Sequence, residues 1–264
     1  MRRIGNKVEE STASALSGYV LAFLGEFDRA FVHADHAIQL AQKIQNPFAK
    51  ANAYHLRGCI CDQQGEWTQA IKDYEKAIRI AEKAEDLFRL YLVKSWKGRA
   101  HVMIGELSRG RELLEESLTL AEKIGTKFWL AWQKTALSAC LFMLGELETG
   151  SQLCQEAICL GEETSDKYVI AFANRTFAEI LCRMEPSDPE RADRVILEAI
   201  RIQQEIDAKP EIARSYVCYA NLLTGMGGEE KAKGYLAKAI GMFQQMGMTW
   251  DLTQADQLYR KLRI

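Results

Sequence analysis

Apolar residues recur along the chain with the period of an α-helix. In the clearest stretch, Ile71, Tyr74, Ala77, Ile78 and Ala81 follow the i, i+3, i+4, i+7 spacing that places side chains on one face of a helix. Such a face becomes buried when the helix packs against a neighbour, while the polar positions between these residues face solvent. The pattern predicts helices rather than strands, and therefore an all-α fold.

A longer period of 40 residues organises these helices. The dipeptide Gly-Glu begins at residues 25, 65, 105 and 145, so each occurrence lies 40 residues after the one before. Columns of small residues keep this period with a single step of 42, and the clearest of them is Ala37, Ala77, Ser117, Ala157, Ala199 and Ala239. Small residues at fixed positions let helix backbones approach closely. The period therefore predicts stacked helix pairs.

Turn residues place the boundaries of the repeats. Each Gly of the Gly-Glu dipeptides is expected to end a first helix in the left-handed conformation, with the following Glu at the positive end of the second helix. Asn46-Pro47 and Asp188-Pro189 place a capping residue and a proline where a helix begins. We expect one domain over residues 1–264. Its repeats are predicted at about 8–46, 47–85, 86–125, 126–166, 167–208 and 209–247, followed by a capping helix at 249–263.

Charge and cysteine usage narrow the classes of function. The chain has 34 Lys and Arg against 36 Asp and Glu, so it lacks the positive excess with which proteins neutralise a phosphate backbone. No apolar run reaches membrane-spanning length, and we expect a cytoplasmic protein that binds neither nucleic acid nor membrane. The seven cysteines are dispersed and odd in number, which predicts free thiols rather than disulfides or a zinc site.

No arrangement of residues predicts catalysis or a cofactor. His33 and His36 lie three residues apart and could reach one metal ion from one helix, but no third ligand can be assigned. No Ser/His/Asp or Cys/His set can be placed at one site. We therefore predict no catalytic residue, no metal and no cofactor, and do not expect an enzyme.

The residues within a repeat resemble the signature of the tetratricopeptide repeat (TPR) family. Gly58-x2-Cys61 in the first helix is followed by Ala70-x3-Tyr74-x2-Ala77 in the second. The resemblance implies a TPR solenoid, a right-handed superhelix of six helix-turn-helix repeats plus a capping helix, and a protein- or peptide-binding scaffold. The long repeats are similar to the arrays attached to signalling ATPases and adenylate cyclase-like proteins, which implies the regulatory or interaction module of a signalling assembly.

The resemblance also implies which residues face a partner, because the first helices of a TPR superhelix line its concave side. In the register of the repeats, the candidate groove residues are Trp132, Phe142, Phe172, Arg175, Arg183, Arg214 and Asn221. Aromatic residues and arginine carry much of the energy of many interfaces. Only Glu179 lies among the arginines to offset their charge, so the groove is expected to accept an acidic, partly apolar peptide.

Alternatives remain open for both fold and function. HEAT and armadillo repeats have periods of about 40–47 residues, so a HEAT-like scaffold is the alternative fold. An RNA-binding helical repeat is the alternative function, although it would need paired polar residues at fixed positions of each repeat. The column formed by Asn52, Leu92, Trp132, Phe172 and Arg214 shows no such regularity. An enzyme built on a TPR scaffold is the weakest of the alternatives.

The N-terminal edge has an unusual composition. The first helix of a solenoid normally carries a polar outer face, yet here apolar residues lie nearly all round it. They are Ala13, Ala15, Leu16, Tyr19, Val20, Leu21, Phe23 and Leu24. Something is therefore expected to cover this edge: a second copy of the chain through self-association, a preceding domain of a longer protein, or residues 1–10 folded back over it.

Overall fold

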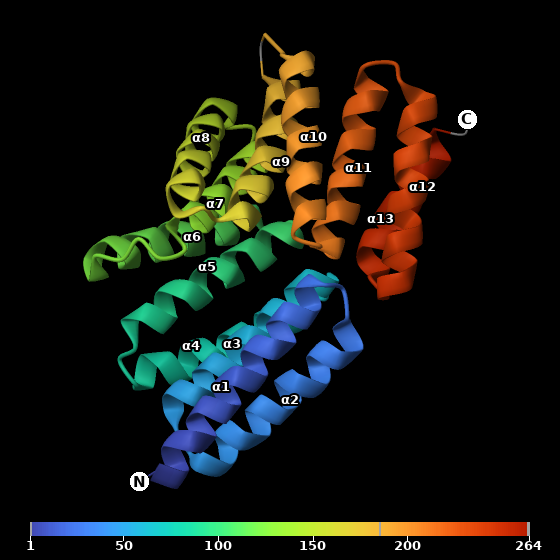
Figure 1. Cartoon of the computed structure of the whole chain (residues 1–264). Coiled ribbons are helices and arrows are strands. Elements are labelled where there is room, and N and C mark those ends of the chain that lie inside the picture. The colour runs from blue at the N-terminus through green and yellow to red at the C-terminus, as the bar shows by residue number, and fades with distance from the viewer. Residues whose placement is uncertain (1, 185, 263–264) are drawn as a thin grey trace. The chain divides into compact units, whose positions relative to one another are not determined.

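The structure is a computed structural model that describes residues 2–184 and 186–262, and it confirms the predicted all-α fold. This part of the chain contains thirteen α-helices and no strand (Figure 1). The helices form two compact units, Met1–Phe128 and Trp129–Ile264. The expected organisation as one domain stays a prediction.

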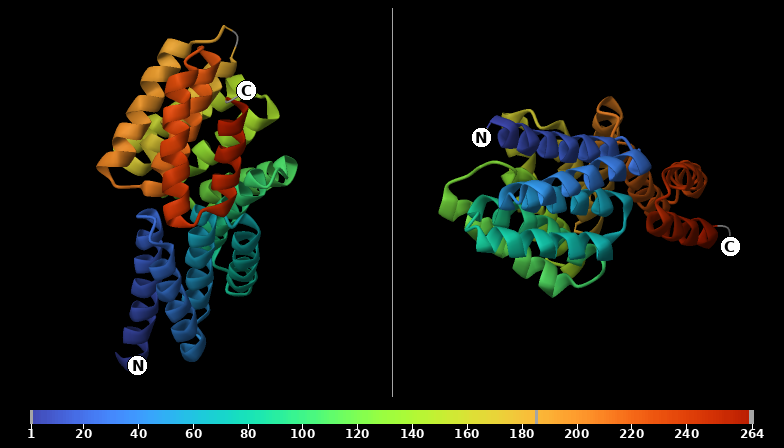
Figure 2. Two further views of the ribbon diagram at one scale, coloured as in Figure 1. Left: turned by 90° about the vertical axis from the view of Figure 1, so that its right-hand side faces the viewer. Right: turned by 90° about the horizontal axis from the view of Figure 1, so that it is seen from below.

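Unit 1 contains three helix pairs. In each pair the two helices run antiparallel and pack side by side, as α1 and α2 show in Figures 1 and 2. The helices are α1 (Arg2–Phe23), α2 (Phe27–Ile44), α3 (Pro47–Gln64), α4 (Trp67–Lys83), α5 (Leu87–Met103) and α6 (Leu107–Ile124). The first helices α1, α3 and α5 contact one another in order, so each pair stacks on the next.

Unit 2 repeats this arrangement and ends with an unpaired helix. Its helices are α7 (Leu130–Leu144), α8 (Leu147–Thr164), α9 (Lys167–Arg183), α10 (Pro189–Glu205), α11 (Lys209–Gly225), α12 (Glu229–Met246) and α13 (Thr249–Lys261). The last helix, α13, packs against α12. It occupies the place expected of a C-terminal capping helix.

The predicted glycine turns are confirmed. Gly25, Gly65, Gly105 and Gly145 follow first helices with φ of 79°, 90°, 86° and 85°, in the left-handed region. The glutamates after them stand at the N-termini of the second helices, but their side chains make no capping hydrogen bond. Glu106 instead contacts Nδ1 of His101 at 2.7 Å. The expected contribution of these residues is therefore limited to their charge near the helix end.

The start of α7 differs from the starts of neighbouring first helices. Asn46 and Asp86 cap α3 and α5 by accepting the N–H of the residue three positions on, at 2.9 Å in both cases. Thr126 stands one repeat later, and its hydroxyl accepts the N–H of Phe128 instead. Trp129 then takes a left-handed conformation with φ of 65°. The fourth first helix consequently begins at Leu130, several residues after the predicted repeat boundary.

Small residues allow the close packing of first on second helices. An added Cβ at Gly58 would lie 2.5 Å from Cε1 of Tyr74, and Tyr74 is fully buried. Ala37, Ala77 and Ala199, from the small column, are likewise fully buried. The 40-residue columns therefore mark contacts between the helices of a pair.

Candidate partner-binding site

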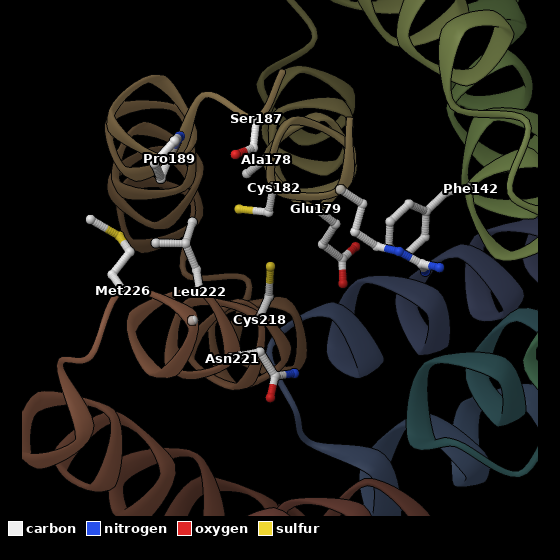
Figure 3. Close-up of a pocket in the computed structure, with 12 residues that line it drawn as sticks. Phe142, Ala178, Glu179, Cys182, Ser187, Pro189, Cys218, Asn221, Leu222 and Met226 are labelled. Atoms are coloured by element: carbon white, nitrogen blue, oxygen red, sulfur yellow. The ribbon is translucent and has the colours of Figure 1, made fainter. Parts of the chain in front are cut away.

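A pocket of about 540 Å³ opens on unit 2 among α7, α9 and α11 (Figure 3). It brings together three of the predicted groove residues, Phe142 on α7, Arg183 on α9 and Asn221 on α11. Its other lining residues are Ala178, Glu179, Cys182, Ser187, Pro189, Cys218, Leu222, Gly225 and Met226. The lining is mainly apolar with a few polar groups, which is the usual composition of a ligand site.

Phe142 and Arg183 form one side of this pocket. The guanidinium carbon of Arg183 lies 4.8 Å from the centre of the Phe142 ring, within the range of a cation–π interaction. Arg183 is exposed, and it forms no ion pair with any described residue. Its charge is therefore available to a bound molecule.

Glu179 places a carboxylate on the pocket wall, and Figure 3 shows it beside Cys218. Burial raises the pKa of Glu179, while Arg175, a hydrogen bond from the Cys218 thiol and Arg183 act in the opposite direction. Burial also raises the pKa of Cys218 well above its usual value, and the charge of Glu179 adds to this effect. The Cys218 thiol therefore stays protonated and donates to the carboxylate.

The other two predicted arginines are already paired, which corrects the expectation of a positive stretch offset only by Glu179. Nη1 of Arg175 lies 2.5 Å from a carboxylate oxygen of Glu211 on α11. Arg214 contacts Glu211 at 2.9 Å and Asp251 on α13 at 2.9 Å. All four side chains are less than one-tenth exposed. Because each cation has an acidic partner, this part of the inner surface carries little net charge.

Two predicted aromatic anchors belong to the core of unit 2. Trp132 is fully buried, and Phe172 is 6% exposed. Their ring centres are 6.3 Å apart, and Trp132 also stacks on Trp129 at 6.0 Å. The expectation that both rings face a partner is therefore wrong for Trp132, whose ring packs between helices. Phe172 exposes only a small part of its ring to a partner.

The acidic partners of the two arginines, Glu211 and Asp251, were not among the predicted site residues, although their spacing from the arginines in the sequence could have identified them. Arg175 and Glu211 are 36 residues apart, and Arg214 and Asp251 are 37 apart. In unit 1, Asp62 and Arg99 form a buried ion pair with the same spacing of 37. A spacing of one repeat minus about one helical turn connects positions that face each other on successive first helices. Residues of opposite charge at this spacing in the sequence could therefore have predicted these ion pairs.

Within residues 2–184 and 186–262, no helix is long and apolar enough to cross a membrane. In the same part of the chain, no three His, Cys, Asp or Glu side chains come together as a possible metal site.

Comparison with known proteins supports tetratricopeptide repeats in unit 1. The family model described as "Tetratricopeptide repeat" matches residues 11–83. The match lies within unit 1, and the paired-helix fold of both units is similar to that of tetratricopeptide repeat proteins. A comparison with curated protein sequences finds no match.

Solved structures with a similar fold include complexes with a bound factor or peptide. A Rap protein complexed with Competence and Sporulation Factor is 14% identical, with a TM-score of 0.68 over 95% of this chain and 73% of that one. NprR in complex with its cognate peptide NprX is 13% identical, with a TM-score of 0.72 over 95% and 72% of the two chains. The tetratricopeptide repeat sensor protein of the STAND class from Pyrococcus horikoshii is 17% identical, with a TM-score of 0.55 over 96% and 39%. These similarities concern the fold.

Proposed function

We propose that the protein is a peptide- or protein-binding scaffold, and that the pocket of unit 2 holds part of the partner. The observation that carries this proposal is the cavity of about 540 Å³ formed by residues of successive first helices. Phe142 and Leu222 offer apolar surface, and the exposed amide of Asn221 can both donate to and accept from a peptide backbone. The protein acts by binding rather than by catalysis.

The charge of the pocket favours a partly apolar partner that carries one acidic group. Arg175 and Arg214 are paired with Glu211 and Asp251, so the expectation of an acidic partner now depends on Arg183. Arg183 is exposed and already lies over Phe142. A carboxylate bound there would meet a cation and an aromatic ring together, a combination that often dominates interface energies.

A regulatory role in a signalling assembly is the context that the fold neighbours support. Two of them were solved with Competence and Sporulation Factor or a cognate peptide bound, and a third is a signal transduction ATPase with a tetratricopeptide repeat sensor. We propose a cytoplasmic location, because the seven cysteines are odd in number and dispersed along the sequence, as is usual for proteins of a reducing compartment.

Selection of peptides from a random display library tests the binding function. The affinity of a selected peptide is then measured by calorimetry for the wild type, Asn221→Ala and Phe142→Ala. Each substitution should weaken binding by about 1 kcal/mol or more. Phe48→Ala is the matched control, because Phe48 is an aromatic residue of unit 1 that is 54% exposed. This variant should bind the peptide as tightly as the wild type does. Failure to select any peptide, or equal affinity for all four proteins, would contradict the proposal.

A second copy of the chain is a further partner that the surface of unit 1 supports. Leu16 and Val20 lie one turn apart on α1 and are 49% and 56% exposed. We propose that this face mediates weak self-association, since adjacent exposed aliphatic residues favour contact with another apolar surface. Light scattering over a range of concentrations tests it, with Val20→Lys expected to shift the protein toward monomer. A wild type that is monomeric at every concentration would contradict it.

A further inference from the structure

Glu179, on the wall of the pocket of unit 2, is a carboxylate for which the chain supplies no counter-ion. It is half-buried on α9, and Figure 3 shows its carboxylate directed away from α9, toward the side where α11 brings Cys218. No Lys, Arg or His of the described residues forms an ion pair with it, and its hydrogen-bond partner there is the Cys218 thiol. A thiol is a weak, neutral donor, so most of the hydrogen-bonding capacity of this carboxylate is left for a bound molecule.

The spacing of the ion pairs between first helices explains why Glu179 lacks a counter-ion. Residues 37 apart face each other on successive first helices and carry opposite charges in buried pairs such as Asp62 with Arg99. The position 37 residues before Glu179 holds Phe142, which cannot neutralise a carboxylate. Where the chain elsewhere pairs two charges, it therefore places an aromatic ring and no cation.

Two arginines of α9 act on Glu179 through their charge, but neither forms an ion pair with it. Arg175, one turn earlier, is paired with Glu211, in a network whose two arginines and two acidic residues balance in charge. Arg183, one turn later, has the spacing of a helical ion pair but lies over the Phe142 ring instead. The pocket therefore presents a carboxylate and a guanidinium group on adjacent turns of α9, each available to a bound molecule.

Burial makes a carboxylate without a counter-ion unfavourable. The surroundings raise the pKa of Glu179, with burial as the main cause, and the nearby arginines reduce this effect without removing it. A positively charged group that enters the pocket would offset this cost. An apolar group would instead bury the carboxylate further and leave it without a partner. The pocket is therefore complementary to a cation at this point.

From these contacts we propose that Glu179 binds a positively charged nitrogen group of the peptide, either an ammonium or a guanidinium. Both groups donate several hydrogen bonds, which the remaining lone pairs of the carboxylate accept. Arg183, on the next turn, takes the acidic group of the same peptide, so the pocket selects a segment in which opposite charges lie close together. This inference rests on the proposed function, because it names the chemistry of the peptide bound in the same pocket.

Calorimetry with one peptide, selected by the wild type from a display library with free N-termini, tests the role of Glu179. Three forms of that peptide are compared: unmodified, acetylated at the N-terminus, and with each Lys replaced by norleucine and each Arg by citrulline. Acetylation removes the N-terminal ammonium, and the replacements remove the side-chain cations. At least one of these changes should weaken binding to the wild type about tenfold. The change that does so identifies the source of the positive charge.

Glu179→Gln should bind the unmodified peptide about tenfold more weakly than the wild type does. In this variant the change to the peptide that weakens binding to the wild type should have little further effect, because the two groups act as a pair. Glu162→Gln is the matched control, since Glu162 is exposed on α8, and this variant should bind all three forms as the wild type does.

Two results would overturn the role of Glu179: equal affinity of the wild type for all three forms of the peptide, or an equal loss of affinity in the wild type and in Glu179→Gln. Both results leave peptide binding itself intact. Failure to select any peptide would instead contradict the proposed function and this inference together.

Discussion

Arg214 on α11 holds Asp251 on α13 through two hydrogen bonds, from Nε to Oδ1 at 2.9 Å and from Nη2 to Oδ2 at 3.0 Å. Both side chains are less than one-tenth exposed. The paired geometry fixes the planes of both groups, and Glu211 occupies another nitrogen of the same arginine. The last helix, which packs against α12, is therefore joined to α11 by this ion pair.

Asp251→Asn should destabilise unit 2 strongly. Removing one partner of a buried ion pair typically costs about 3–5 kcal/mol, because the remaining charge loses its compensation, although Glu211 will reduce the effect here. Urea denaturation followed by circular dichroism measures the change. Glu198→Ala is the control, since the Glu198–Arg201 pair is exposed and such pairs contribute about 0–1 kcal/mol. Equal midpoints for the two variants would show that the buried pair is not formed in solution.

Alanine substitutions at two helical glycines should act with opposite signs. At Gly58 the added Cβ would lie 2.5 Å from the ring of the fully buried Tyr74, and overpacking of this kind costs about 1–3 kcal/mol. At Gly234, in α12, no atom lies within 4 Å of the added Cβ, so Ala should stabilise the helix by about 0.5–1 kcal/mol. Thermal melts of both variants test this pair of predictions. A Gly58→Ala protein as stable as the wild type would refute the assigned contact.

The seven thiols should react with iodoacetamide in the order of their accessibility. Cys159 is exposed and Cys182 is half-buried, so these two should be modified in the native protein. Cys59 and Cys218 are buried, and burial raises the pKa of each, which suppresses the reactive thiolate. They should react only after unfolding. Mass spectrometry of peptides from native and denatured samples distinguishes the two classes, and rapid native labelling of Cys218 would contradict its burial.

His55 should make the protein less stable in mild acid. Its folded pKa lies well below the unfolded value of about 6.5, so only the unfolded state gains a proton as the pH falls below that value. The free energy of unfolding should then fall by up to about 1.4 kcal/mol per pH unit until the folded pKa is reached. Chemical denaturation at pH 7 and pH 5 measures the loss.

Two histidine variants isolate this contribution. His55→Asn should remove the part of the pH dependence of the free energy of unfolding that His55 causes. His36→Asn, at an exposed position of α2, should keep the pH dependence of the wild type. An unchanged pH dependence in His55→Asn would assign the acid sensitivity to other groups.

Local features of this protein can be read from its sequence alone. The period of 40 residues, the turn glycines such as Gly65 and the tight contact at Gly58 could all be predicted. Each depends on local conformation or on packing between neighbouring helices of one pair, and the repeated columns make such contacts visible. The same register placed Phe142, Arg183 and Asn221 on the inner face, where the structure forms the pocket.

The accessibility of the inner-face residues depends on how the helices pack in three dimensions. Trp132 and Phe142 occupy comparable faces of α7, yet Trp132 is fully buried and Phe142 lines the pocket. Arg175 and Arg183 lie two turns apart on α9, yet only Arg175 meets an acidic partner, supplied by the next first helix. The exposure of a residue depends on how closely successive helices pack. The net charge of the surface depends on which side chains of neighbouring helices meet. These properties belong to pairs of helices, and the pattern of a single helix does not contain them.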